Sequence, residues 1–486
     1  MEDVKTKNLG EPVPAAAGTK NDLSFTLLVA LVVGSIIGSG IFALPQNMTV
    51  GAGTAAIVIG WVITGLGMMT LARVYQTLAM KKPELDNGVF AYARALSGEY
   101  AGFNSAWGYW ISAWIGNVGY LVAAFGAVGY FFPIFGEGNT LAACIGSSVV
   151  LWMVHALVLR GIQGAAVLNA VVTAAKLIPL VMFIILVAIA FEVKTFRLDF
   201  WGDAKLGSVM DQIKSTMLVT VWVFIGIEGA SVYSSRAKNR ADVGKATIVG
   251  FLICLVLLSA VSILSLGIFT QAELAVLKNP SMAPVLEKVV GHWGALLIYI
   301  GLIVSVGGGL LAWTLLAAET LFSPSEKGVM PKWLTKKNAN AVPANALWVT
   351  NGLVQVFLLV TLLSKASYLA LISLSTAMIL VPYLFSVGYA LWLAWHTKPI
   401  TQAWFRSDVL LAAVATLYCG WLLHAAGSKY LLLSALLYAP GMLVYIFAKR
   451  QLAQPVFNGA ESIAAIVLWV LAALAGFMLI SGRIAL

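Results

Sequence analysis

Two glycine-containing motifs interrupt apolar segments at positions where a stable helix would be expected to carry leucine or alanine. They are Gly34-Ser-Ile-Ile-Gly-Ser-Gly40 and Trp222-Val-Phe-Ile-Gly-Ile-Glu-Gly229. Glycine lets the backbone leave helical geometry, and the freed amides and carbonyls survive in a bilayer only where they are buried in protein or line a polar cavity. Two interrupted spans, five segments apart, are typical of a transporter site at the middle of the membrane.

Together the two interruptions can hold both ends of an amino acid backbone. A half-helix that begins at Ser39 and Gly40 offers free amides and its positive dipole end to a carboxylate. The unwound carbonyls before it, and those around Ile225, can accept hydrogen bonds from an ammonium group. Close helix packing through Gly34 and Gly38 is the structural alternative. The predicted backbone-binding residues are Ser35, Ile36, Gly38, Ser39, Gly40, Ile225 and Gly226.

Three further side chains could bind a cation or form a gate. Glu228 is an acid at mid-span, and such acids are usually functional. It could be a gate hydrogen bond, a proton carrier or a partner for a cationic substrate; capping of the helix break is the structural alternative. Trp222 abuts the second break, and Trp313 follows three consecutive glycines. Tryptophan is the best cation–π partner, although most of the 16 tryptophans are expected in packing or in the membrane interface.

Two polar residues lie alone in other apolar segments. Lys176 precedes Pro179; it could exchange a proton, stand as a fixed charge in place of a sodium ion, or extend towards the membrane surface. Asn117 could hydrogen-bond a substrate or join two helices.

The composition identifies a polytopic helical membrane protein. Of 486 residues, 60% are hydrophobic and 10% are charged, and the mean hydropathy is +0.92. The three cysteines all fall in apolar segments, and the four histidines lack metal-ligand spacing, so neither a disulfide framework, a metal site nor a cofactor is expected. The net charge of +10 reflects membrane topology rather than nucleic-acid binding.

The hydropathy predicts an all-α protein with thirteen spans. They are residues 25–44, 55–78, 100–132, 140–159, 165–191, 215–234, 247–268, 293–322, 344–363, 368–395, 409–425, 430–447 and 463–480. Loops on one side hold most of the 30 lysines and arginines, which places the N-terminus in the cytoplasm and, with an odd number of spans, the C-terminus outside.

The positions of the breaks divide the chain into three parts. Residues 1–24 are predicted to be a disordered cytoplasmic tail. Residues 25–395 form a transport core of two five-helix halves with opposite orientation, because five spans separate the breaks. Residues 396–486 form three accessory helices that pack, stabilise or dimerise, so a homodimer is one expectation.

The motifs resemble those of the basic amino acid/polyamine antiporter family, within the amino acid–polyamine–organocation superfamily. The resemblance rests on the first-span and sixth-span motifs, Trp114-Ile-Gly-Asn117 and Val381-Pro-Tyr383. The arginine/ornithine branch is suggested by Gln46-Asn-Met48, Pro83-Glu-Leu-Asp-Asn-Gly88, Asn104-Ser-Ala-Trp-Gly-Tyr-Trp110 and Asn279-Pro-Ser-Met282.

This resemblance implies a LeuT-like fold, alternating access and a role for each site residue. Ser39 and Gly40 would hold the substrate carboxylate, and Ile225 the α-amino group. Trp222 would be a middle gate over the aliphatic stem. Trp313 would stack on the cationic head, beside Ala113, Asn117 and Ser375, and the outer gate would be Tyr109, Glu228 and Tyr383. Lys176 resembles the fifth-span lysine of proton-coupled relatives.

The function implied is exchange of external arginine for internal ornithine across the bacterial inner membrane. Arginine/agmatine antiporters are another branch of the family that the sequence resembles. The sequence departs from their pattern at Ser35, where they carry Asn, and at Ser112-Ala113, where they carry Ala-Cys. The alternatives are proton-coupled uptake of lysine or arginine and exchange of another amino acid for its decarboxylated amine. A membrane receptor or enzyme would need a signalling domain or clustered catalytic groups, and the sequence contains neither.

Overall fold

The computed structural model describes residues 24–85, 88–161, 165–228, 240–364, 366–396 and 402–484. Outside these ranges lie residues 1–23 of the predicted tail 1–24, residues 86 and 87, the end of the sixth predicted span at 229–234 and the loop residues 235–239.

The described chain is a bundle of α-helices. In order, the elements are α1 (Phe25–Ile36), η1 (Gly40–Ala43), α2 (Leu44–Thr49), α3 (Thr54–Lys81), α4 (Gly88–Ser97), α5 (Glu99–Phe131), η2 (Pro133–Phe135), α6 (Leu141–Leu159), α7 (Ala165–Ile189), α8 (Val193–Arg197), η3 (Ala204–Leu206), α9 (Val209–Trp222), α11 (Arg240–Ser265), α12 (Gln271–Ala275), α13 (Met282–Val290), α14 (His292–Glu326), η5 (Lys332–Thr335), α15 (Ala344–Ser364), α16 (Tyr368–His396), α17 (Gln402–Gln451) and α18 (Gly459–Ile480).

Within the described residues, ten helices are long and apolar enough to cross a membrane, and the bent pair of α1 with η1–α2 can be counted as an eleventh span. The 50-residue α17 contains two predicted spans, and the non-helical Gly427 separates them. The structure describes the sixth predicted span, residues 215–234, only as far as Glu228. Thirteen spans therefore remain a prediction.

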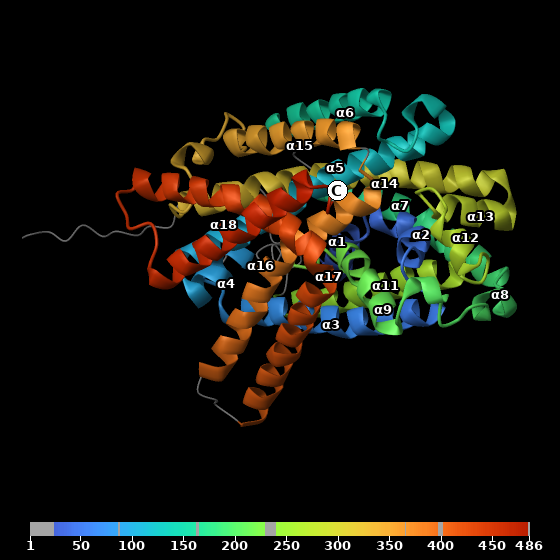
Figure 1. Ribbon diagram of the computed structural model, residues 1–486, viewed down its shortest axis with the longest axis horizontal. Coiled ribbons are helices and arrows are strands. Elements are labelled where there is room, and N and C mark those ends of the chain that lie inside the picture. Colours follow the sequence, from blue (N-terminus) through green and yellow to red (C-terminus); the bar gives the residue numbers. More distant parts are fainter. Residues whose placement is uncertain are drawn as a thin grey trace, which may run out of the picture.

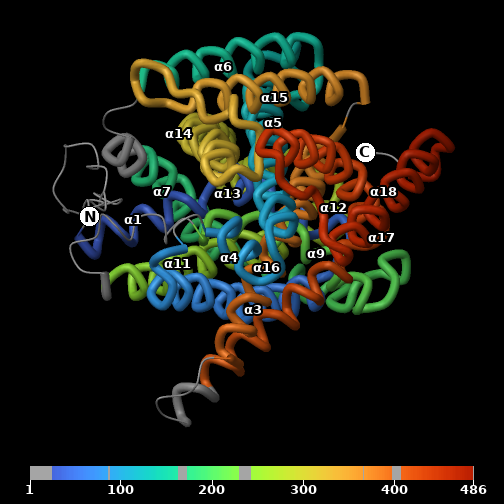
Figure 2. The backbone as a smooth tube through the Cα atoms, turned by 90° about the vertical axis from the view of Figure 1, so that its left-hand side faces the viewer, coloured from blue at the N-terminus to red at the C-terminus, as the bar shows by residue number. Residues whose placement is uncertain are grey.

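The helices can be described as two edges of the bundle and a group of helices between them. α6 and α15 lie side by side along one edge, and α3 lies along the opposite edge (Figures 1 and 2). Between these edges, α5 packs against both α14 and α16 (Figure 2). With 33 and 35 residues, α5 and α14 measure about 50 Å at 1.5 Å per residue, so both are expected to tilt in a hydrocarbon layer of about 30 Å.

The first predicted interruption is confirmed. α1 ends at Ile36, Ile37 adopts an extended conformation, and the chain resumes as η1 and α2 after a bend of 46°. In the sixth span, α9 ends at Trp222 and the residues from Val223 to Glu228 form turns. Gly226 has φ +109°, which side-chain-bearing residues rarely adopt. Both interruptions therefore follow from glycines in otherwise helical sequence.

Candidate substrate-binding site

Side chains from other helices satisfy the carbonyls freed by the first break. Lys176 Nζ, on α7, donates to the carbonyl oxygen of Gly34 at 2.7 Å and also to that of Ile37. Ser305 Oγ, on α14, donates to the Gly38 oxygen at 3.4 Å. Lys176 is only 2% exposed and points to the break, which excludes its extension towards the membrane surface. The ammonium group of Lys176 therefore supplies a fixed positive charge beside the carbonyls at the first break.

The two breaks lie against each other through glycines. A Cβ on Gly226 would lie 2.9 Å from the carbonyl oxygen of Ser35, and Ser35 Oγ donates to the Gly226 oxygen at 3.4 Å. A Cβ on Gly40 would lie 2.7 Å from Val223 and 2.9 Å from Trp222 Nε1. Close packing and an unwound site, which the sequence offered as alternatives, are therefore both present at the same residues.

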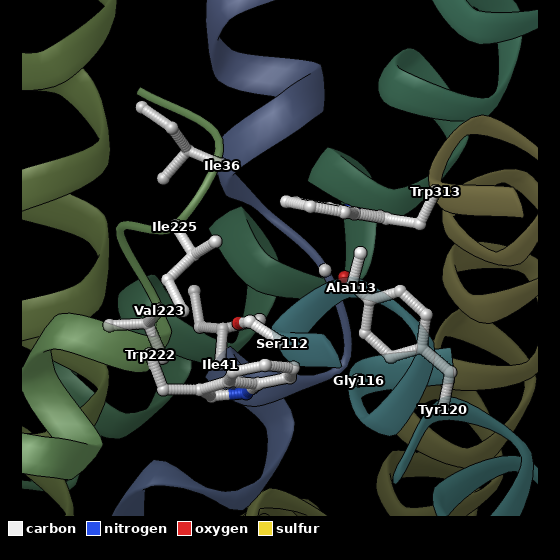
Figure 3. Close-up of a pocket in the computed structure, with 12 residues that line it drawn as sticks. Ile36, Ile41, Ser112, Ala113, Gly116, Tyr120, Trp222, Val223, Ile225 and Trp313 are labelled. Carbon is white, nitrogen blue, oxygen red and sulfur yellow. The ribbon is translucent and has the colours of Figure 1, made fainter. Parts of the chain in front are cut away.

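A small cavity lies between the two breaks, α5 and α14. In Figure 3, the indoles of Trp313 and Trp222 bound it from opposite sides, and the Tyr120 ring bounds it laterally. The lining residues are Ile36, Gly38, Gly40, Ile41, Ser112, Ala113, Gly116, Tyr120, Trp222, Val223, Ile225 and Trp313. None of these described lining residues is acidic, so aromatic faces and backbone dipoles dominate the walls.

An aromatic cluster closes one side of the cavity. The rings of Tyr120 and Trp222 meet edge to face, with centroids 6.1 Å apart. Beside them, Ser39 Oγ and Tyr368 Oη share a hydrogen bond of 2.9 Å. All four side chains are buried. This closure joins the first break, the end of α9, α5 and the start of α16.

A carboxylate cluster closes the other side. Tyr109 Oη donates to Glu228 Oε1 at 2.6 Å, and Tyr383 Oη donates to Oε2 at 2.8 Å. The backbone N–H of Gly226 donates to both carboxylate oxygens at 3.3 Å. The Tyr109 ring lies 6.5 Å from that of Trp313, centroid to centroid. Four donated bonds compensate the burial of Glu228, which is 6% exposed.

The Glu228 cluster brings together the three residues expected at the outer gate, and the side of the membrane that it faces stays a prediction. The antiparallel helices α5 and α16 place Gly119 against Tyr368 and bond Ser112 to Ser375. Tyr109 precedes Ser112 on α5, so its cluster lies towards the start of α5, whereas the Tyr120–Trp222 cluster lies towards its end. The excess of lysine and arginine in the loops on one side predicts that the start of α5 faces the cytoplasm. That prediction would place the Glu228 cluster on the inner side and the cluster of Trp222, Tyr120, Ser39 and Tyr368 on the outer side, opposite to what the resemblance implies.

Asn117 and Ser375 lie just behind the cavity wall. Asn117 Nδ2 donates to Thr314 Oγ1 at 3.3 Å, whereas its Oδ1 is buried without a partner in the described part of the chain. One amide atom therefore joins two helices, and the other has no partner among the described residues. Ser375 Oγ donates to the Ser112 carbonyl oxygen at 2.7 Å and contacts Ser112 Oγ at 3.2 Å.

The structure brings all the predicted binding residues to this region, but not all to the wall. Seven line the cavity, namely Ile36, Gly38, Gly40, Ala113, Trp222, Ile225 and Trp313. Ser35, Ser39, Asn117, Gly226 and Ser375 support those residues from behind.

The sequence prediction missed five wall residues and the Tyr368 partner of Ser39. The five are Ile41, Ser112, Gly116, Tyr120 and Val223. Helical spacing could have identified Gly116 and Tyr120, because they lie three and seven positions after Ala113 and so share its face of α5. Tyr368 has no such signal, since it is 329 residues from Ser39 along the chain.

Two broken helices that face each other around a cavity in a membrane-spanning bundle define a secondary transporter of the alternating-access class. The family model described as amino acid permease matches residues 23–441, and this chain belongs to that family.

Similar curated proteins span almost the whole chain. An arginine/ornithine antiporter of Pseudomonas aeruginosa is 55% identical over 461 residues, covering 92% of this chain and 96% of the relative. An L-lysine transport protein of Corynebacterium glutamicum is 41% identical, covering 97% and 98%. An arginine/agmatine antiporter of Chlamydia caviae is 39% identical, covering 95% and 97%.

Proposed function

We propose that this protein exchanges external arginine for internal ornithine by alternating access. The observation that carries the proposal is the cavity between Trp222 and Trp313, whose described walls hold aromatic faces and free backbone groups but no carboxylate. Such a site suits a small molecule with an amino acid backbone and a cationic side chain. The relatives named as antiporters of arginine supply the substrate pair.

The backbone of the substrate is assigned to the two breaks. The amides at Ser39 and Gly40 begin the half-helix η1–α2 and face the carboxylate. The carbonyl oxygen at Ile225, in the turns after α9, accepts from the α-amino group. Trp222 covers the aliphatic stem and separates it from the outside.

The cationic head is assigned to the opposite end of the cavity. There the Trp313 face supplies a cation–π contact, and the unpartnered Oδ1 of Asn117 accepts a hydrogen bond. The end of the cavity near Trp313 is narrow and weakly polar, because small side chains lie there: Ser112, Ala113 and, behind them, Ser375. Arginine and ornithine each carry one net positive charge at neutral pH, so exchange of one for the other moves no net charge and needs no ion gradient.

We also infer the setting of the protein from the charge pattern and the apolar C-terminal helices. The protein lies in the bacterial inner membrane with its N-terminus in the cytoplasm and, for thirteen spans, its C-terminus in the periplasm. α17 and α18 lie outside the repeat and offer lipid-facing apolar surface to a second copy, such as Leu417 and Ile466, which are 73% and 64% exposed. A homodimer through these helices is part of the proposal.

Counterflow in proteoliposomes tests the exchange directly. Vesicles loaded with ornithine are expected to accumulate labelled arginine, and empty vesicles to take up little. A panel of internal lysine, agmatine and putrescine ranks the alternative counter-substrates. Uptake supported by agmatine but not ornithine would replace the proposal with an amino acid–amine exchange, which moves net charge and responds to membrane potential.

Lys176 supports a second candidate, proton-coupled uptake of lysine or arginine. Its amine bridges two carbonyls of the first break, so a change in its protonation would act on the unwound segment. A pH gradient imposed on empty vesicles separates the mechanisms, because a symporter accumulates substrate there and an exchanger does not. Lys176→Met, which keeps the length but removes the charge, would abolish such gradient-driven uptake.

A further inference from the structure

The last helix of the chain carries a single charged residue, and that residue contacts the start of another helix. Across residues 459–480 of α18, Glu461 is the one acid or base. α18 packs along α17, and its buried side chains are Ala465, Ala472 and Ala475. Such small side chains let helices approach closely but form no hydrogen bonds. The carboxylate in the first turn is therefore the specific polar feature of this helix.

The two oxygens of Glu461 accept hydrogen bonds from two different helix starts. Oε2 accepts from the backbone N–H of Asn458 at 2.9 Å, and Asn458 Oδ1 accepts in return from the N–H of Glu461 at 2.9 Å, which forms a capping box at the start of α18. Oε1 accepts from the backbone N–H of Tyr100, in the first turn of α5, at 3.4 Å. Glu461 and Tyr100 are 361 residues apart in the sequence, so this second contact depends on the fold.

The start of α5 has no side chain of its own to cap it. The N-cap residue is Gly98, with φ +89° and ψ −173°, and a helix leaves its first N–H groups without intrahelical partners. A Cβ on Gly98 would lie 3.2 Å from Glu461 Oε1, so the glycine leaves room for the carboxylate. α14 begins in the same way at Gly291, with φ +84° and ψ −172°, but no atom outside its chain neighbours lies within 4 Å of the Cβ position there. The contact with Glu461 is therefore particular to α5 rather than a general property of such glycine starts.

Charged side chains of α4 and α17 hold the same turn of α5. Glu99 Oε1 accepts from Arg94 Nη2 at 2.7 Å, and Glu99 Oε2 accepts from Lys449 Nζ. Lys449 is only 3% exposed and also donates to Gln454 Oε1 at 2.9 Å. Removal of one partner from a buried ion pair is strongly destabilising, so this pair fixes the start of α5 against the end of α17.

An aromatic group lies next to these charges. The Tyr100 ring lies 5.2 Å from that of Tyr445 on α17 and 5.1 Å from that of Phe457 in the loop before α18, measured between centroids. The rings of Tyr445 and Phe457 lie 5.8 Å apart. Aromatic pairs at such distances are stabilising. The first turn of α5 is thus held by α4, α17 and α18 together, through charged, polar and aromatic contacts.

We propose that Glu461 is a positioning residue, through which α18 caps the start of α5 and sets the place of Tyr109, the donor to Glu228. Tyr100 and Tyr109 belong to one continuous helix and lie about two and a half turns, or about 14 Å, apart along it. A shift or rotation of the first turn of a helix is passed on to the turns that follow. The α5 residues on the cavity wall begin at Ser112, so Glu461 acts through α5 and does not touch the substrate. This inference rests on the proposed exchange function.

Hydrogen exchange tests the cap independently of transport. In the purified full-length protein, Glu461→Ala is expected to speed deuterium uptake at residues 99–102 about fivefold, because the Tyr100 N–H loses its acceptor and the helix start loses a negative charge. Asn458→Ala is the matched control, since it removes the other half of the capping box but leaves Glu461 in place, and it should leave this uptake unchanged. Equal uptake in the parent and Glu461→Ala, or the same increase in both variants, would overturn the proposal.

Exchange in ornithine-loaded vesicles tests the link to Tyr109. Glu461→Ala is expected to lower the maximal rate about fivefold with an unchanged KM for arginine, and Asn458→Ala to keep the parent rate. Glu461→Ala combined with Tyr109→Phe should be no slower than Tyr109→Phe alone, because both changes act on one hydrogen bond. A combined loss equal to the product of the single losses, or a change in KM alone, would contradict positioning through Tyr109. If the parent shows the cap by hydrogen exchange but does not exchange arginine for ornithine, the proposed function has failed and the cap of α5 stands.

Discussion

Tyr109 donates a hydrogen bond of 2.6 Å to Glu228, and its ring also lies beside Trp313 at the wall of the cavity. One side chain on α5 therefore belongs to both the Glu228 cluster and the proposed cation end of the substrate site. A substrate head that shifts Trp313 can act on the hydrogen bond at Glu228 through this single ring. The closure is polar and has fixed geometry, whereas the opposite closure is mainly aromatic contact.

Tyr109→Phe is expected to slow exchange because it removes one donor from a buried carboxylate and leaves the ring in place. Hydrogen bonds to charged groups contribute about 1.5–3 kcal/mol, which corresponds to a change of roughly tenfold or more in the population of the closed inner state. Initial rates in ornithine-loaded vesicles measure the effect. Tyr92→Phe, on α4 and away from the cavity, is the control and should keep the parent rate. Parent-like rates for both variants would rule out this bond as a gate.

Trp313→Ala is expected to lower arginine exchange about 30-fold at substrate concentrations well below the KM. Loss of a desolvated cation–π contact of about 2 kcal/mol weakens binding about 30-fold. Isothermal titration of the purified protein with arginine measures the affinity. Trp293→Ala is a matched control on the same helix, because Trp293 is 48% exposed at the start of α14. Equal arginine affinity for both variants would remove Trp313 from the site.

Trp222→Leu is expected to reduce turnover more than binding. Leucine keeps apolar contact with the proposed position of the aliphatic stem, but it cannot form the edge-to-face contact with Tyr120, which we propose to close the outer side. The maximal exchange rate should fall about tenfold with arginine affinity largely retained, since gate closure rather than binding is affected. Affinity and rate are measured on the same preparation, and a fall in affinity with a normal rate would reverse the assignment.

Local composition was sufficient to predict the breaks but not their partners. Gly38 and Gly40 interrupt an apolar run, and this interruption is visible in any window of the sequence around them. The hydrogen bonds of Ser39 with Tyr368 and of Asn279 with Gln46 depend on how distant helices pack, so no periodicity within either segment encodes them.

The sequence predicts poorly how deep in the membrane a side chain lies and towards which neighbour it points. Lys176 had three interpretations because Pro179 and the length of its span left its level in the membrane undefined. The structure resolves its direction, since the amine reaches the carbonyls of Gly34 and Ile37. The membrane side of Tyr109, Glu228 and Tyr383 stays a prediction in the same way: the resemblance implies an outer gate, whereas their place near the start of α5 lies towards the end that the charge pattern predicts to be cytoplasmic.

Gly226→Ala is the sharpest test of the contact between the two breaks. The backbone there has φ +109°, and an added Cβ would meet the carbonyl oxygen of Ser35 at 2.9 Å. Because that oxygen belongs to the backbone, no side-chain rotation relieves the contact, and the strained conformation alone costs about 1–3 kcal/mol. The first break must move away from the sixth span, which separates the amides of the carboxylate site from the Ile225 carbonyl.

This variant is therefore expected to lose exchange and to unfold at a lower temperature in detergent. Gly307→Ala on α14 is the matched control, because no atom lies within 4 Å of its added Cβ and a helical alanine is favoured over glycine by about 1 kcal/mol. It should exchange like the parent and melt at the same or a higher temperature. If Gly226→Ala also exchanged normally, the two breaks would not need to touch, and a substrate bound between their peptide dipoles would lose its structural basis.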